Sequence, residues 1–266
     1  MKTRLLAALA LLLAAPLAAQ EIVTLPVRED ATQSYLLLAP NAPPQAVAVL
    51  FPGGPGLLRL RAASGQPQFS PNNFLVRSRE HFVVAGVALG IFDAPSDYQI
   101  EGMPNAFRKS AQHTADVRRV VSDLKVRFPG VPVFLIGTSM GTVSAAYVGR
   151  ELATEVAGVV LTASVFVSSG RRSKHGDSNL SDFDLASIKT PMLIVHHRED
   201  ACSITPYGDA SQRAGKIPLI SVRGGDPPTS EPCESQSRHG FLGKERATVE
   251  ALVRWMLKKP HPAEIE

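Results

Sequence analysis

The stretch of the chain that most limits its fold is LIGTSMG, residues 135–141, in which Ser139 stands between Gly137 and Gly141. The apolar run 131–137 predicts a buried strand, and residues 140–152 predict the helix that follows it. Glycine on both sides of a serine indicates a tight turn in which larger side chains would clash. We therefore expect Ser139 to lie at a strand-to-helix corner, with its hydroxyl pointing out from the edge of a sheet.

Short apolar runs alternate with longer amphipathic segments along the rest of the chain. Strands are predicted at residues 21–27, 34–39, 46–51, 83–89, 131–137, 157–163, 191–197 and 217–222. Helices are predicted at residues 72–81, 107–128, 140–152, 206–214 and 242–259. The later strands are continuous Val/Ile/Leu runs, which is typical of parallel strands buried on both faces. The first two have no helix between them and predict an antiparallel hairpin at one edge. The pattern predicts a mostly parallel, doubly wound α/β sheet of about eight strands, with ligands at the carboxyl ends of the strands.

The first residues have the form of a secretory signal peptide. Lys2 and Arg4 precede a Leu/Ala run, which ends in Pro16 and small residues up to Ala19. The run is shorter than the roughly 20 apolar residues of a membrane-spanning helix, so an uncleaved anchor is the less favoured alternative. We expect residues 1–19 to be a signal peptide, residues 20–266 to form a single domain, and the protein to be periplasmic or secreted without a stable membrane anchor.

The charge balance of the exported chain is close to neutral. Without Lys2 and Arg4, 26 of the 28 basic residues remain against 24 acidic ones, which gives a net charge of +2. This balance gives no sign of nucleic-acid binding.

Two cysteines, Cys202 and Cys233, remain in the exported chain. Because exported proteins meet an oxidising compartment, a disulfide between them is our first expectation. The alternatives are two separate buried thiols or a metal pair, and the absence of a CxxC spacing disfavours the metal.

The residues Gly137, Thr138, Ser139, Met140 and Gly141 fit the pattern G-x-S-x-G, and here the chain resembles the α/β-hydrolase superfamily. The resemblance implies a serine nucleophile held in strained backbone geometry at the start of a helix. The positive end of that helix favours negative charge developing beside the hydroxyl. It also implies the chain order nucleophile, acid, histidine.

A glycine loop, PGGPG, follows the predicted strand 46–51 directly. Pro52 and Pro55 have no backbone N–H to donate, so the candidate oxyanion donors there are chiefly Gly53 and Gly54. The loop is similar to the HGGPG loop of proline-iminopeptidase-like hydrolases, with Pro52 in place of the usual histidine. That likeness implies Gly54 as one donor of the oxyanion hole, and the superfamily implies the residue after the nucleophile, Met140, as the other. A merely tight Gly/Pro turn is the alternative.

The acid and the base are expected downstream of Ser139, each after a strand. Asp200 follows the predicted strand 191–197, and His239 lies in the loop after the last strand, so we assign Asp200 as the acid and His239 as the base. The alternative acids are Glu199, Asp177, Asp182 and Asp184. Of the other histidines, His196 and His197 are expected to pack or cap a strand, while His81, His113, His175 and His261 lie outside the expected position.

The interval 164–190, where this superfamily often carries a cap, is short and polar. We therefore expect no substantial cap domain and an open site for short-chain or exposed esters. The basic run Arg171 to His175 is more easily explained as a solvated loop than as an anion-binding site, and the role of Asp93 stays open. The expected function is a serine hydrolase acting on a small-molecule carboxylic ester through a Ser-His-Asp acyl-enzyme, with no metal or organic cofactor. The alternatives are an aminopeptidase-like serine peptidase and an exported ligand-binding protein without catalytic activity.

Overall fold

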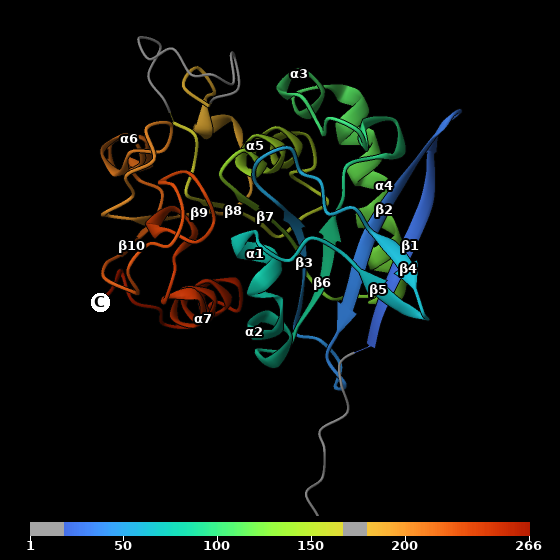
Figure 1. Ribbon diagram of the computed structural model, residues 1–266, viewed down its shortest axis with the longest axis horizontal. Helices are drawn as coiled ribbons and strands as arrows, with labels where there is room; N and C mark the ends of the chain where they lie inside the picture. Colours follow the sequence, from blue (N-terminus) through green and yellow to red (C-terminus); the bar gives the residue numbers. More distant parts are fainter. Residues whose placement is uncertain (1–18, 167–179) are drawn as a thin grey trace, which may run out of the picture.

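The computed structural model describes residues 19–166 and 180–266, and its centre is one sheet of nine strands (Figure 1). The strands are β1 (Ala19–Arg28), β2 (Ala31–Ala39), β3 (Ala46–Phe51), β6 (Val87–Phe92), β7 (Val133–Thr138), β8 (Gly158–Thr162), β9 (Met192–His197), β10 (Leu219–Val222) and β11 (Glu264–Ile265). Their order across the sheet is β1-β2-β6-β3-β7-β8-β9-β10-β11. β1 and β2 form the predicted antiparallel hairpin at one edge, and the strands from β6 to β11 run parallel. The predicted mostly parallel sheet is confirmed.

Helices cover both faces of this sheet (Figure 1). They are α1 (Phe74–Arg77), α2 (Arg79–Val84), α3 (Asn105–Arg108), α4 (Ala111–Arg127), α5 (Gly141–Glu151), α6 (Tyr207–Ala214) and α7 (Glu245–Met256). Apolar side chains of α4, α5 and α6 pack on one face, and those of α1, α2 and α7 pack on the other. Alternate residues of β3 face the two sides: Val49 joins the first layer and Leu50 the second. The fully buried central strands explain why their sequences are continuous apolar runs.

The strand predicted at residues 83–89 is displaced. Val83 and Val84 belong to α2, and the strand β6 begins only at Val87. Gly86, with φ of 83°, makes the turn between them, and the Val84 side chain is 88% exposed. The sequence gives an apolar run across this turn, so periodicity alone does not separate the helix end from the strand.

Two predicted helices are each divided in two. The segment 72–81 forms α1 and α2, which meet at Ser78, and the segment 107–128 forms α3 and α4. The hydroxyl of Ser110 caps α4 by accepting a 3.1 Å hydrogen bond from the His113 N–H. Ser110 is thus a helix start signal inside a segment that was predicted as continuous.

The remaining differences lie in short elements and near the N-terminus. The two-stranded sheet of β4 (Arg61–Ala63) and β5 (Gln66–Gln68) and the edge strand β11 were not predicted. Residues 1–18 lie outside the described residues, so the signal peptide at 1–19 stays a prediction, and β1 begins at its last residue. Within residues 19–166 and 180–266, no helix has the length and apolar character needed to cross a membrane.

Candidate active site

Ser139 lies at the sharp corner between β7 and α5. Its φ of 52° is in the left-handed region, which a residue with a side chain rarely adopts. A Cβ atom on Gly137 would lie 2.4 Å from the Gly141 carbonyl oxygen, and one on Gly141 would lie 2.0 Å from the Phe51 carbonyl oxygen. Both glycines are therefore required sterically, because the two strands and the helix start approach one another at backbone distance.

Asp200 and His239 are brought together by the loops that follow β9 and β10. His239 lies in the 3-10 helix Arg238–Gly240, and its Nδ1 is 2.9 Å from Oδ2 of Asp200. The other carboxylate oxygen accepts a 2.9 Å hydrogen bond from the Cys202 N–H. Burial alone would raise the pKa of Asp200, but the neighbouring imidazoles of His196 and His239 outweigh it and hold that pKa well below its usual range. Asp200 is therefore an anion at neutral pH, directed at one nitrogen of the His239 ring.

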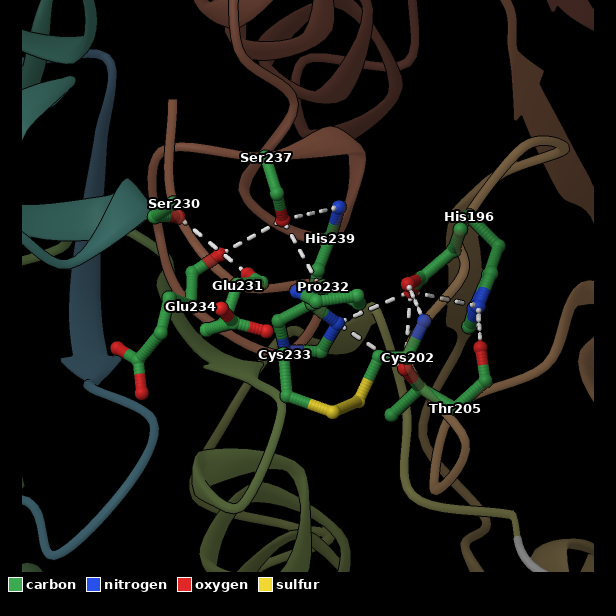
Figure 2. Close-up of a disulfide and its surroundings, with 11 residues drawn as sticks. His196, Cys202, Thr205, Ser230, Glu231, Pro232, Cys233, Glu234, Ser237 and His239 are labelled. Atoms are coloured by element: carbon green, nitrogen blue, oxygen red, sulfur yellow. Dashed lines mark hydrogen bonds and ion pairs between the residues drawn. A yellow bond between two sulfur atoms is a disulfide. The ribbon is translucent and has the colours of Figure 1, made fainter. Parts of the chain in front are cut away.

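Thr205 is a member of this cluster that the sequence analysis missed (Figure 2). Its hydroxyl donates to Oδ2 of Asp200 at 2.9 Å and lies 3.0 Å from Nδ1 of His239. Its carbonyl oxygen accepts a 2.8 Å hydrogen bond from Nε2 of His196, a fully buried residue of β9. A threonine five residues after an acid carries no sequence signal that would have identified it.

Glu199 and Asp184, two of the alternative acids, have other partners, and the alternative bases His196 and His197 are the last residues of β9. Glu199 is directed to Arg238, with 3.6 Å between its Oε2 and the arginine Nε, and Asp184 caps the 3-10 helix Leu185–Ser187. Nε2 of His197 donates to the Gly224 carbonyl oxygen at 3.0 Å. His196 and His197 thus pack within and beside β9, while Asp177 and His175 lie outside the described residues.

The predicted disulfide between Cys202 and Cys233 is present and joins the loop that carries Asp200 to the loop that carries His239 (Figure 2). The two Cα atoms are 4.5 Å apart. Donor atoms of Asp200, Cys202 and His239 lie within 4.8 Å of one another, which resembles a metal-ligand group. The Cys202 sulfur is bonded to Cys233, however, so the group lacks the thiolate that such a site requires.

The glycine loop, residues 52–56, lies against the serine corner. A Cβ on Gly53 would be 3.0 Å from the Ser139 Cβ, and Gly54 has a φ of 56°. Met140, the other predicted donor, occupies the N-cap position of α5. The two predicted oxyanion donors are thus carried by the glycine loop and by the start of α5, which both adjoin Ser139.

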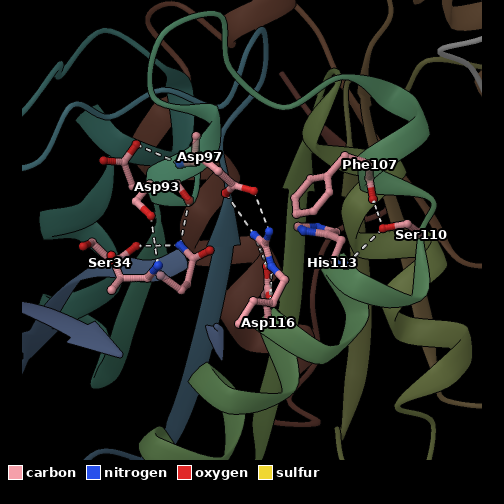
Figure 3. Close-up of polar contacts among 12 residues, drawn as sticks. Ser34, Asp93, Asp97, Phe107, Ser110, His113 and Asp116 are labelled. Atoms are coloured by element: carbon pink, nitrogen blue, oxygen red, sulfur yellow. Dashed lines mark hydrogen bonds and ion pairs between the residues drawn. The ribbon is translucent and has the colours of Figure 1, made fainter. Parts of the chain in front are cut away.

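Asp93, to which the sequence assigns no role, supports the segment after the glycine loop. It is 1% exposed, and its carboxylate accepts hydrogen bonds from the N–H groups of Leu58 at 2.7 Å and Leu60 at 2.9 Å. The backbone N–H groups of Arg59 and Ala94 donate to it as well. Asp93 lies at the carboxyl end of β6 near Asp97 (Figure 3) and holds the loop backbone in place.

A pocket of about 900 Å³ opens beside Ser139 and His239. Its walls come from the glycine loop, the segment 97–105, the start of α1 and the loop 233–240. Apolar side chains such as Phe74 and Ile204 alternate there with the carboxylates of Asp97, Glu101 and Glu234. Of these, Asp97 is bound by both terminal nitrogens of Arg28. The pocket is large enough for a small organic ligand.

Three comparisons relate this architecture to known proteins. A family model described as "Serine aminopeptidase, S33" matches residues 95–175. Est1E from Butyrivibrio proteoclasticus with bound ferulic acid is 14% identical, with a TM-score of 0.61 and coverage of 89% of this chain and 98% of that one. An α/β serine hydrolase without lid from Xanthomonas campestris is 14% identical, with a TM-score of 0.56 and coverage of 91% and 96%.

A monoglyceride lipase from Saccharomyces cerevisiae is 12% identical, with a TM-score of 0.58 and coverage of 90% and 94%. No curated protein matches the chain. At these identities the structural likeness concerns the fold, and it extends over nearly the whole chain.

Proposed function

We propose that the chain, which has the α/β-hydrolase fold, is a serine hydrolase that cleaves small carboxylic esters. The observation that carries the proposal is that one pocket is lined by both Ser139 and His239. Ser139 has a strained backbone, and His239 is hydrogen-bonded to Asp200. A ligand-binding module has no need of a nucleophile, a base and a charged orienting acid in one place.

The proposed reaction is acyl transfer in two steps. Ser139 attacks the acyl carbonyl while His239 accepts the hydroxyl proton and then gives it to the leaving alcohol. Asp200, held as an anion, stabilises the imidazolium and fixes the tautomer that carries a proton on Nδ1. In the second step His239 activates water, which releases the acid and restores Ser139.

The oxyanion of each tetrahedral intermediate is proposed to lie between the N–H groups of Gly54 and Met140. The glycine loop and the start of α5 both adjoin Ser139, which supports this assignment. The start of α5 directs further backbone N–H groups to the same region.

The short interval between β8 and β9 favours an ester substrate over a peptide. The chain between β8 and β9 spans residues 163–191, which leaves little length for a cap that would read the amino end of a peptide. The basic run 171–175 falls in this interval, outside the described residues. A bound ferulic acid in Est1E and a monoglyceride lipase among the similar structures agree with esters. The peptidase alternative is supported by the description of the matching family model and by the carboxylates of Glu101 and Glu234, which suit a cationic amino group.

Hydrolysis of p-nitrophenyl esters from acetate to laurate, beside amino-acid arylamides, tests the proposal. We expect the short esters to be cleaved fastest and Ser139→Ala to lose the activity and the reaction with a fluorophosphonate probe. Ser122→Ala, at an exposed serine of α4, serves as the matched control and should retain both. Faster cleavage of arylamides would favour the peptidase, and an inert Ser139 in a protein that binds ligand would favour the non-catalytic alternative.

We further propose that the protein acts in the periplasm or outside the cell. The signal-like residues 1–19 and the disulfide, which is typical of oxidising compartments, support this location. Mass spectrometry of the protein secreted from the full-length gene should give a chain that begins at Gln20. An intact chain in the cytoplasm would contradict the proposal.

A further inference from the structure

Arg108 is a fully buried arginine whose hydrogen-bond partners in the described part of the chain are all uncharged. Its Nε donates to the Met103 carbonyl oxygen at 3.3 Å, its Nη1 to the Ser144 hydroxyl at 3.0 Å and its Nη2 to the Gly54 carbonyl oxygen at 3.0 Å. Among residues 19–166 and 180–266, no carboxylate forms an ion pair with it. Burial lowers the pKa of Arg108 to about 10, so the guanidinium keeps its charge at neutral pH.

A buried, unpaired charge is costly, and buried arginines are nearly always paired with an acid. A hydrophobic side chain would fill the same space at a lower cost to folding. Packing alone therefore does not explain why an arginine occupies this position.

The two ends of the guanidinium bind the two elements that flank Ser139. Gly54 belongs to the glycine loop, and Ser144 lies in α5, one helical turn beyond Met140. These are the elements that carry the two proposed oxyanion donors. One rigid, planar group thus spans the distance between them.

The glycine loop also packs directly on Arg108. A Cβ on Gly56 would lie 2.8 Å from Nη2 of Arg108 and 2.5 Å from Cε of Met103. The Met103 N–H in turn donates to the Pro55 carbonyl oxygen at 2.9 Å. A movement of Arg108 would therefore shift the loop that lies against Ser139.

We propose that Arg108 is a positioning residue that fixes the spacing of the two halves of the oxyanion hole and adds an uncompensated positive charge behind it. This inference rests on the proposed hydrolase function. Because the charge has no acidic partner, its field is available to an anion that develops at the serine corner in the transition state. Substrate in its neutral ground state gains little from that field, so the effect falls on kcat rather than on KM.

The experiment compares Arg108→Met, Arg108→Lys and Ser144→Ala in p-nitrophenyl acetate hydrolysis. For Arg108→Met we expect kcat to fall about 100-fold with KM changed less than about threefold, the size of effect seen when one oxyanion donor is lost. Arg108→Lys keeps the charge and should recover part of kcat. Ser144→Ala cuts only the bond to α5 and should lower kcat by a smaller factor while the protein stays folded, as judged by circular dichroism.

Two further measurements distinguish a positioning role of Arg108 from a general loss of structure. A boronic acid, which forms a tetrahedral anion on the serine, should lose affinity in Arg108→Met in parallel with kcat, whereas the affinity for a neutral aliphatic alcohol should not change. Arg118→Met, which removes an exposed arginine of α4, is the matched control and should behave as wild type.

The outcomes distinguish this inference from the proposed function. A folded Arg108→Met with wild-type kcat and boronate affinity overturns the role of Arg108 while the hydrolase stands. An Arg108→Met variant that changes only KM, with wild-type kcat, would also overturn the role of Arg108. If the wild type neither cleaves esters nor reacts with a fluorophosphonate at Ser139, the hydrolase function fails, and the role of Arg108 fails with it.

Discussion

The hydroxyl of Thr205 donates a 2.9 Å hydrogen bond to Oδ2 of Asp200. The same oxygen faces Nδ1 of His239, so Thr205 helps to fix the rotamer of the acid and the plane of the proposed base. Thr205 is fully buried, and water cannot replace its hydroxyl without a local rearrangement.

Thr205→Val is expected to lower kcat/KM for a short ester about 10- to 100-fold, since a hydrogen bond to a charged group contributes about 1.5–3 kcal/mol. Thr205→Ser keeps the hydroxyl and should restore most of the activity. The measurement is kcat/KM for the three proteins. Recovery in the serine variant would tie the loss to the hydroxyl that bonds Asp200, because a purely structural loss would not follow that hydroxyl. Equal kcat/KM for the valine variant and the wild type would remove Thr205 from the proposed machinery.

The disulfide is expected to stabilise the protein and to align the two loops that it joins. Replacing both Cys202 and Cys233 by alanine should lower the free energy of unfolding by about 3 to 4 kcal/mol in the chain-entropy model, for a sequence separation of 31. Ester hydrolysis well below the melting temperature should also fall, because Asp200 and His239 lie on these loops. Urea unfolding and kcat at 25 °C are the measurements. Unchanged kcat in the folded double variant would limit the bond to a stabilising role.

The central sheet could be predicted because each strand is marked by a local run of apolar residues in the sequence. β3 matches its predicted bounds, since its run of buried apolar residues ends at Pro52. The displaced β6 and the two divided helices show where this reasoning fails. Their limits depend on Gly86, Ser78 and Ser110, single residues whose turns do not interrupt the apolar pattern.

The proposed triad could be predicted because each member follows a strand and the resemblance to the α/β-hydrolase superfamily implies their order. Thr205 and Arg108 could not, because their roles arise from contacts that form only in the folded chain. In the sequence, Arg108 is indistinguishable from an ordinary cation on a helix face. Only the structure shows that its Nη1 and Nη2 bind Ser144 and Gly54. The sequence shows only that Asp93 follows a strand end, and its backbone partners become apparent only in the folded chain.

The glycine that follows the serine corner should tolerate no side chain. Gly141→Ala places a methyl group 2.0 Å from the Phe51 carbonyl oxygen, and a backbone atom cannot move aside as a flexible side chain can. We expect a loss of at least about 3 kcal/mol in the free energy of unfolding, or no folded protein. Gly208→Ala in α6, where no atom lies within 4 Å of the new methyl, should instead leave stability unchanged or raise it by up to about 1 kcal/mol. Similar urea midpoints for the two variants would contradict this steric account.

His113 is expected to make the protein sensitive to acid. The ring is fully buried against Phe51, Phe92 and Phe107, and among the described residues neither of its nitrogens has a hydrogen-bond partner. Burial, together with the charges of Arg108 and Arg28, lowers the pKa of His113 to about 3. The unfolded chain, with a histidine pKa near 6.5, therefore binds more protons between these two values than the folded protein does.

The free energy of unfolding should consequently fall as the pH is lowered through 6.5 toward 3, by about 2 kcal/mol between pH 7 and pH 5 for this one residue. His113→Phe keeps an aromatic ring in the same apolar site and removes the titrating group, so its stability at pH 7 should be similar and its loss toward pH 5 smaller by that amount. Urea unfolding at a series of pH values measures the difference. If His113→Phe and wild type lose stability in parallel, His113 is not the group responsible, because a buried histidine that stays neutral in the folded state must contribute this slope.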